Sequence, residues 1–173
     1  SSGSRFLCTY MFKNNKKLLT NKNNTTMKKL FSLCLICLLA VSAMAQDYVD
    51  LGLPSGTLWK RQNESGFYTY EEAINRFGNK LPKKYHFVEL QKECTWIWMD
   101  DYGYKVVGPN GNSITLPAAG FRNRGDVYHV GTDGRYWSST PYDSDYAWSL
   151  YFDSRAVYMY FYRGYGLSVR LVQ

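Results

Sequence analysis

Apolar and polar side chains alternate along the last part of the chain, with the period of a half-buried β-strand. In residues 146–153 the positions expected to face the core are Tyr146, Trp148, Leu150 and Phe152. The positions expected to face outward there are Ala147, Ser149, Tyr151 and Asp153. In residues 156–163 the inward set is Val157, Met159 and Phe161, and the outward set is Tyr158, Tyr160 and Tyr162. The pattern therefore predicts two strands with a ladder of tyrosines on their outer face.

Helical spacing appears earlier, over residues 69–77 and again from about residue 83 to 94. Apolar residues recur at this spacing in the first segment: Tyr70, Ala73, Ile74 and Phe77. Thr69 lies three residues before Glu72, which is the spacing of a capping box, and Gly78 is typical of a helix end. In the second segment one helical face carries Phe87, Leu90 and Cys94.

Further strands are predicted where β-favouring residues are bounded by Gly, Pro, Asn or Asp. They are expected over residues 48–53, 57–59, 104–107, 113–116, 135–139 and 167–172. The tetrapeptide at residues 109–112, Pro-Asn-Gly-Asn, is typical of a hairpin turn. Two helices followed by a β-rich second half indicate the α+β class.

The front of the chain has the composition of a secretory signal peptide. Met27, Lys28 and Lys29 precede an apolar run over residues 30–41, and Ala43-Met44-Ala45 forms a small-x-small cleavage site. The apolar run is shorter than the roughly 20 residues that span a bilayer. We therefore expect no transmembrane segment and cleavage after Ala45. Residues 1–26 are interpreted as upstream or vector-derived sequence. Residues 46–173 form one domain that is periplasmic, displayed on the cell surface or secreted.

The charge distribution argues against a nucleic-acid partner. The 173 residues carry a formal charge of +7, but seven of the 21 basic residues and none of the 14 acidic ones precede residue 46. The part predicted to fold is therefore neutral and offers no electrostatic attraction for a phosphate backbone. Cys94 is the single cysteine after cleavage, so we expect no internal disulfide and interpret it as a small buried hydrophobic residue.

The residues that catalysis or metal binding needs are scarce. His86 and His129 are the only histidines, and no nucleophile-elbow or phosphate-binding glycine motif occurs. Asp126, His129 and Asp133 are close enough in sequence to gather in one loop, but a solvated turn is the preferred interpretation. We therefore expect no enzymatic activity, no metal site and no cofactor.

Ordered blocks of the folding part resemble the Fibrobacter succinogenes major paralogous domain, which is abundant in exported proteins of Bacteroidetes. These blocks cover residues 49–59, 81–82, 94–96, 103–114, 116–120, 136–139 and 168–170. The resemblance implies a C-type lectin-like fold in which the first and last strands pair. It also implies a link to variable proteins of diversity-generating retroelements, in which adenine positions near the 3′ end of the gene are mutated.

The C-terminal region contains the candidate ligand-binding residues. They are Tyr142, Asp143, Asp145, Tyr146, Ser149, Tyr151, Asp153, Tyr158, Tyr160, Tyr162 and Tyr165. Tyrosine offers a large rigid contact area with few rotors to freeze, which is why paratopes are rich in it. Arg163 and Arg170 are expected to brace the frame instead. The hypothesis is a monomeric protein that recognises a protein or glycan ligand. The alternative is a structural subunit of a surface assembly, oligomeric through a permanent aromatic interface.

Overall fold

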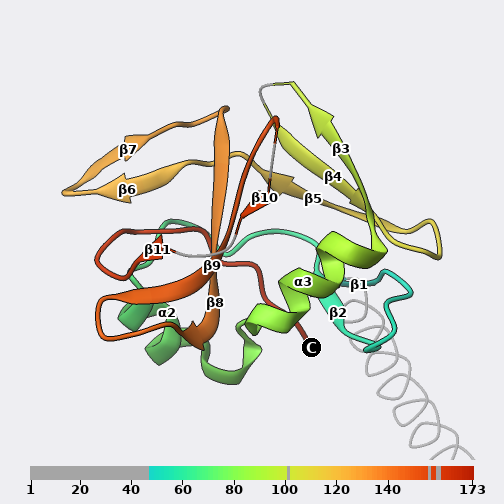
Figure 1. Cartoon of the computed structure of the whole chain (residues 1–173), viewed down its shortest axis with the longest axis horizontal. Helices are drawn as coiled ribbons and strands as arrows, with labels where there is room; N and C mark the ends of the chain where they lie inside the picture. The colour runs from blue at the N-terminus through green and yellow to red at the C-terminus, as the bar shows by residue number, and fades with distance from the viewer. Residues whose placement is uncertain (1–46, 101, 156, 159–160) are drawn as a thin grey trace, which may run out of the picture. The chain divides into compact units, whose positions relative to one another are not determined.

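The computed structural model describes residues 47–100, 102–155, 157–158 and 161–173 (Figure 1). The chain divides into two units, residues 1–45 and 46–173, and the description below concerns the second. The predicted signal peptide and the sequence before it lie outside the described residues. The helices are α2 (Tyr70–Phe77) and α3 (Lys84–Glu93), with a 3-10 turn η1 (Gly78–Lys80). The strands are β1 (Tyr48–Asp50), β2 (Leu58–Lys60), β3 (Thr95–Met99), β4 (Gly103–Val107), β5 (Ser113–Pro117), β6 (Phe121–Asn123), β7 (Asp126–Tyr128), β8 (Asp133–Pro141), β9 (Tyr146–Asp153), β10 (Val157–Tyr158) and β11 (Phe161–Tyr162).

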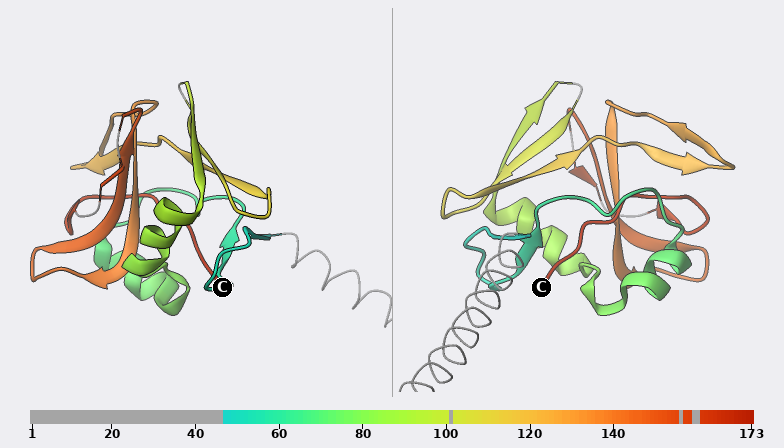
Figure 2. Two further views of the ribbon diagram at one scale, coloured as in Figure 1. Left: turned by 45° about the vertical axis from the view of Figure 1, so that its right-hand side comes forward. Right: turned by 180° about the vertical axis from the view of Figure 1, so that it is seen from behind.

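Over the described ranges the strands form four small antiparallel sheets. β1 pairs with β2, β6 pairs with β7, and β3, β4 and β5 form a meander. β9 is the centre of the fourth sheet, because β8 pairs along one edge while β10 and β11 pair along the other. Figure 2 shows α2 and α3 on the side of this unit away from the tips of the β3–β4 and β6–β7 hairpins.

Both predicted helices are present with the expected ends. The capping box of α2 forms, since Thr69 Oγ1 accepts the Glu72 amide at 3.4 Å and Glu72 Oε2 accepts the Thr69 amide at 2.8 Å. Gly78 ends the helix at a φ of 50°, a backbone conformation that favours glycine. α3 ends at Cys94, which is partly buried beside the core.

The C-type lectin-like fold with paired terminal strands is a wrong prediction. The structure consists mostly of short strands in small sheets, and β1 pairs with β2 rather than with a C-terminal strand. The last residues form isolated bridges instead, at Tyr68–Leu167, Tyr136–Ser168 and Trp59–Val172. The first two bridges join other parts of the chain, and backbone hydrogen bonds join Leu171 and Gln173 to Lys60 and Leu58 of β2. The coarser α+β description fits loosely.

The interior consists of two clusters of buried side chains. One contains Trp59, Tyr136 and Phe152, none of which exposes any surface. The other is built around Trp137, whose indole N–H donates to the Tyr68 carbonyl at 2.7 Å. Burial of these large rings supplies the main stabilisation of the domain.

Arg170 braces this frame, as predicted. Its side chain is 1% exposed, and the guanidinium donates to Asn63 Oδ1 at 2.8 Å and to the carbonyls of Lys60 at 2.8 Å and Thr115 at 2.6 Å. The buried charge is therefore surrounded by acceptors, which a buried cation requires.

Candidate functional site

The predicted ligand-binding residues do not form one surface. Those placed by the structure separate toward the two ends of β9, which at about 3.3 Å per residue lie roughly 23 Å apart. The residues near the first end are Tyr142, Asp143, Asp145, Tyr146, Tyr162 and Tyr165. Tyr151 and Asp153 lie at the other end. Tyr160 lies outside the described residues, and for Tyr158 only the backbone pairing with Tyr151 is described.

Four tyrosines at the first end form what we call the tyrosine face: Tyr142, Tyr146, Tyr162 and Tyr165. Tyr142, Tyr146 and Tyr162 expose 56%, 38% and 45% of their surface. Tyr146 and Tyr162 are register partners of β9 and β11, and their rings meet at 5.8 Å and 68°. Tyr165 is half-buried and packs edge-on against Tyr162 at 5.4 Å. The face is therefore continuous from β9 through β11 to the following turn.

The turn between β8 and β9 holds the first part of this face. The amides of Tyr142 and Asp143 both donate to the Tyr146 carbonyl at 3.1 Å. Asp143 Oδ1 accepts the amides of Asp145 at 2.8 Å and Tyr146 at 2.7 Å. Such side-chain caps on backbone amides stiffen a turn. Asp143 therefore shapes the loop, while the neighbouring tyrosines present their rings.

Two cationic side chains support the tyrosine face from beside it. Arg163 donates to the Tyr146 carbonyl at 3.1 Å, and its guanidinium lies 4.6 Å from the ring centroid of Tyr70. Arg163 thus braces the frame, as predicted. Lys84 Nζ lies 3.2 Å from the centroid of Trp148, against which Tyr142 packs edge-on at 5.3 Å. The exposed rings consequently rest on ordered side chains.

The outward assignment of Ser149 is wrong. Ser149 and Ala147 are both fully buried, whereas Tyr146, predicted to face the core, is exposed. The alternation fails because both faces of β9 are covered: Leu150 and Phe152 pack in the Trp59 cluster, and Ala147 packs in the Trp137 cluster. Among the described residues Ser149 Oγ has no hydrogen-bond partner. Ser149 cannot touch a ligand in this structure.

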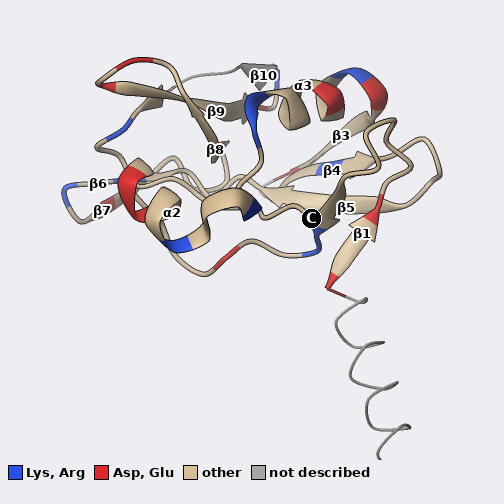
Figure 3. Ribbon diagram, turned by 90° about the horizontal axis from the view of Figure 1, so that it is seen from below, with Lys and Arg blue, Asp and Glu red and all other residues tan. Residues whose placement is uncertain are grey.

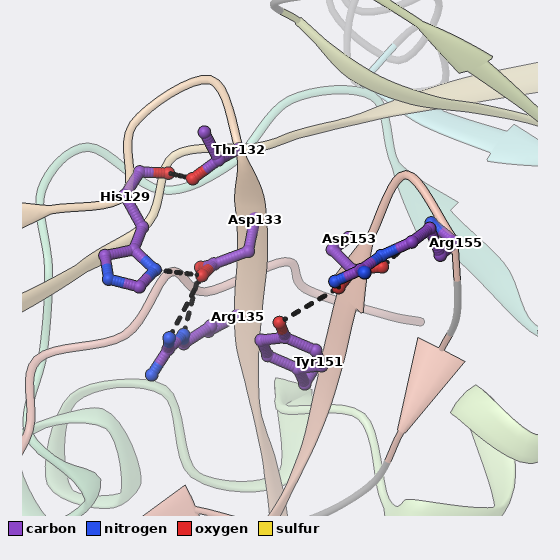
Figure 4. A network of polar contacts seen from close by, with 7 residues as sticks. All are labelled: His129, Thr132, Asp133, Arg135, Tyr151, Asp153 and Arg155. Atoms are coloured by element: carbon purple, nitrogen blue, oxygen red, sulfur yellow. Dashed lines mark hydrogen bonds and ion pairs between the residues drawn. The ribbon is translucent and has the colours of Figure 1, made fainter.

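A polar network occupies the other end of β9 (Figure 4). Arg135 donates through Nε and Nη2 to the two carboxylate oxygens of Asp133, both at 3.0 Å, and His129 Nδ1 lies 2.7 Å from Asp133 Oδ2. The Arg135 guanidinium also lies 3.9 Å from the ring of Phe121 and 4.3 Å from that of Phe161. Asp133 is 2% exposed, so the predicted solvated turn is wrong at this residue. Asp133 and Arg135 form a buried ion pair, and the rings of Phe121 and Phe161 lie against the guanidinium.

A pocket of about 360 Å³ opens beside this network. It is lined by His129, Thr132, Asp133, Tyr151, Asp153, Ser154 and Arg155. The Tyr151 hydroxyl donates to Asp153 at 3.4 Å, and burial, followed by the nearby Asp133 carboxylate, raises the pKa of that phenol. Asp126 belongs to the exposed strand β7 and does not line the pocket. The sequence offered no signal for Arg135, whose role depends on rings distant along the chain.

Within residues 47–173 where the structure describes them, no three His, Cys, Asp or Glu side chains gather in a way that could hold a metal ion. None of the described helices is both long and apolar enough to cross a membrane.

Comparison with known proteins adds one similarity. Residues 95–172 are similar to a family described as a domain of unknown function (DUF8237). This region runs from β3 almost to the C-terminus and includes the tyrosine face and the Asp133 network. Searches of curated proteins and of solved structures found no match. The family description names no ligand, so the function has to be inferred from the site.

Proposed function

We propose that this chain is an exported ligand-binding protein that recognises a protein partner through the tyrosine face. One observation carries the proposal: Tyr146 and Tyr162 are exposed side by side on paired strands, and Tyr142 is exposed in the capped turn whose backbone bonds to Tyr146. Contiguous exposed aromatic surface is uncommon on monomeric proteins and usually belongs to an interaction site. The ordered supports beneath the rings lower the entropic cost of binding.

The arrangement of the rings favours a protein over a glycan as the ligand. Tyr146 and Tyr162 meet at 68°, and Tyr162 and Tyr165 meet at 75°. Rings at such angles offer no single flat platform on which a sugar could stack, but they offer edges and hydroxyls that suit the mixed surface of a protein.

The burial pattern supports a second part of the proposal, diversification of this face by a retroelement. Among the candidate ligand-binding residues, Asp143 and Asp145 are exposed in the turn before β9, whereas the later residues Leu150, Phe152 and Gly166, which are not candidates, are buried. Ser149 is a candidate that is buried as well. Sequencing the 3′ end of the gene across its source population tests this part. Substitutions confined to adenine positions at the exposed residues are expected, and an invariant 3′ end would remove it.

A site-specific crosslinking experiment tests recognition of a protein. A photoreactive phenylalanine analogue is placed at Tyr146 and, as a matched control, at Tyr85 of α3, which is 55% exposed. With the surface-protein fraction of the producing cells, we expect a discrete crosslinked protein from position 146 that is absent from position 85. The crosslink should disappear when Tyr162→Ser is added. Equal products from both positions, or none from position 146, would refute recognition of a protein.

The structural alternative gives a different result in the same experiment. A permanent aromatic interface would crosslink the chain to a second copy of itself, and size-exclusion chromatography at micromolar concentration would show an oligomer that Tyr162→Ser dissociates. We expect a monomer whose elution is unchanged by that substitution.

A further inference from the structure

A groove of about 540 Å³ lies between α2 and the segments around residues 67 and 122, outside the tyrosine face. Its lining residues are Phe67, Tyr68, Glu72, Asn75, Arg76 and Arg122. The lining therefore combines two guanidinium groups and one carboxylate with two aromatic rings.

The aromatic floor of the groove is part of the ordered frame. Tyr68 is 9% exposed, and its hydroxyl donates to the Ser65 carbonyl at 2.6 Å. Its backbone exchanges hydrogen bonds with Leu167, at 3.0 Å and 2.9 Å. Phe67, the second ring of the floor, is half-buried.

The wall formed by Arg122 is tied to the same stretch of chain. The backbones of Arg122 and Gly166 exchange two hydrogen bonds of 2.8 Å. A Cβ added at Gly166 would lie 3.1 Å from Cβ of both Arg122 and Phe67, so the absence of a side chain there lets the wall approach the floor. Floor and wall are therefore held together by residues 166 and 167, and the groove is preformed.

The charges around the groove leave an excess of positive charge. The Arg76 guanidinium lies 5.5 Å from the ring centroids of Tyr68 and Phe77, and within the described ranges no carboxylate forms an ion pair with it. Arg122 Nη2 is 4.0 Å from Glu72 Oε2, and both side chains are substantially exposed, so this pair contributes little. That oxygen already accepts the Thr69 amide in the capping box. Figure 3 shows the acidic start and the basic end of α2.

We propose that this groove binds a small organic acid with an apolar ring or chain. The carboxylate would lie between Arg76 and Arg122, since guanidinium groups pair with planar carboxylates through two parallel hydrogen bonds. The Asn75 amide is an additional donor in the lining. The apolar part would cover Phe67 and Tyr68. This site is independent of the proposed recognition of a protein partner.

Calorimetric titration of the folded chain with phenylacetate tests the proposal, with 2-phenylethanol as the probe of the same shape that lacks the charge. Phenylacetate should bind at least about tenfold more tightly. Arg76→Gln and Arg122→Gln should each weaken the binding of phenylacetate by about tenfold. The matched control Arg124→Gln, at an exposed arginine that does not line the groove, should leave its affinity unchanged. Thermal melting of each variant checks that the fold is intact.

Glu72→Gln provides a test with the opposite sign. It keeps an oxygen that can accept the Thr69 amide but removes the one carboxylate among the groove's lining residues, so phenylacetate should bind several-fold more tightly. Equal affinity for phenylacetate and 2-phenylethanol, or unchanged phenylacetate binding in both arginine variants, would overturn the proposal. So would binding of an acidic peptide such as hexa-aspartate without binding of phenylacetate.

Discussion

Asp133 and Asp153 lie directly opposite each other in the β8–β9 ladder. Like charges at facing positions of an antiparallel pair destabilise a sheet. The structure offsets this repulsion separately for each carboxylate. Asp133 is paired with the buried Arg135, whereas Asp153 accepts the Arg155 amide at 2.8 Å near the surface. The pairing at this end of β8 and β9 therefore depends on the groups that bind the two carboxylates.

Replacing Arg135 should destabilise the domain more than any change of a surface charge. Arg135→Met keeps an unbranched chain but removes the guanidinium, which leaves Asp133, 2% exposed, without its bidentate partner. Loss of one member of a buried pair costs about 3–5 kcal/mol. Urea unfolding followed by tryptophan fluorescence measures the change.

The matched control for that experiment is Arg155→Met. Arg155 contacts Asp153 at 3.4 Å with a side chain that is 85% exposed, and exposed pairs contribute about 0–1 kcal/mol. Adding Asp133→Asn to Arg135→Met should recover part of the loss, because the uncompensated charge is removed. If Arg135→Met and Arg155→Met lower stability equally, the buried pair has no special role.

Ser149→Ala should be neutral or stabilising, although Ser149 is fully buried in the central strand. Within the described part of the chain its hydroxyl has no partner, and a buried unsatisfied hydroxyl costs about 1–3 kcal/mol of desolvation. The control is Ser138→Ala, whose equally buried Oγ accepts the Thr140 amide at 3.1 Å. We expect the melting temperature to fall for Ser138→Ala and not for Ser149→Ala. A lower melting temperature for Ser149→Ala would mean that the hydroxyl is bonded.

Gly134→Ala should destabilise the domain through a clash with Phe152. A Cβ at Gly134 would lie 2.1 Å from Cζ of the Phe152 ring, and the two residues are register partners of β8 and β9. Overpacking of this kind typically costs about 1–3 kcal/mol. Adding Phe152→Leu removes the phenyl ring with which the new Cβ would clash. The double variant should therefore lose less unfolding free energy than the sum of the two single losses. Additive losses in the unfolding free energy would exclude the clash as the cause.

Features that depend on neighbours in sequence could be predicted well. The capping box of Thr69 and Glu72 and the hairpin around residues 109–112 are both present, because each is decided within a few residues. The strand β3 was missed because the expected helix ended at Cys94 and no turn residue separates the two. Its Thr-Trp-Ile-Trp sequence, rich in β-formers, was the available signal.

Features that depend on distant parts of the chain could not be predicted. Ser149 is buried because core residues cover both faces of β9, and an alternating pattern predicts only one covered face. The sequence pattern of residues 167–172 predicts a strand, yet the backbone amides and carbonyls of this segment form hydrogen bonds with several separate segments. The tyrosine face was predicted in part: Tyr142, Tyr146 and Tyr162 lie together, whereas Tyr151 lies at the opposite end of the strand.

The stability of the domain should fall between about pH 10 and pH 12 because of Tyr136. Burial raises the pKa of this phenol from 10.0 to about 12, and its hydroxyl donates to the Pro117 carbonyl at 2.8 Å. The folded state therefore retains the proton at a pH where the unfolded chain has lost it. This contribution is complete below pH 10 and disappears as the pH rises toward 12.

Tyr136→Phe isolates this effect in a series of urea unfolding curves against pH. The variant should be less stable than the parent at pH 8, because the hydrogen bond is lost, but its stability should decline less from pH 10 to 12. Burial also raises the pKa of Cys94, from 9.0 to about 11, so its proton contributes a similar decline at slightly lower pH. Both proteins should therefore carry Cys94→Ala. If the unfolding free energies of the two proteins decline in parallel with rising pH, the pKa of Tyr136 is no higher in the folded chain than in the unfolded one.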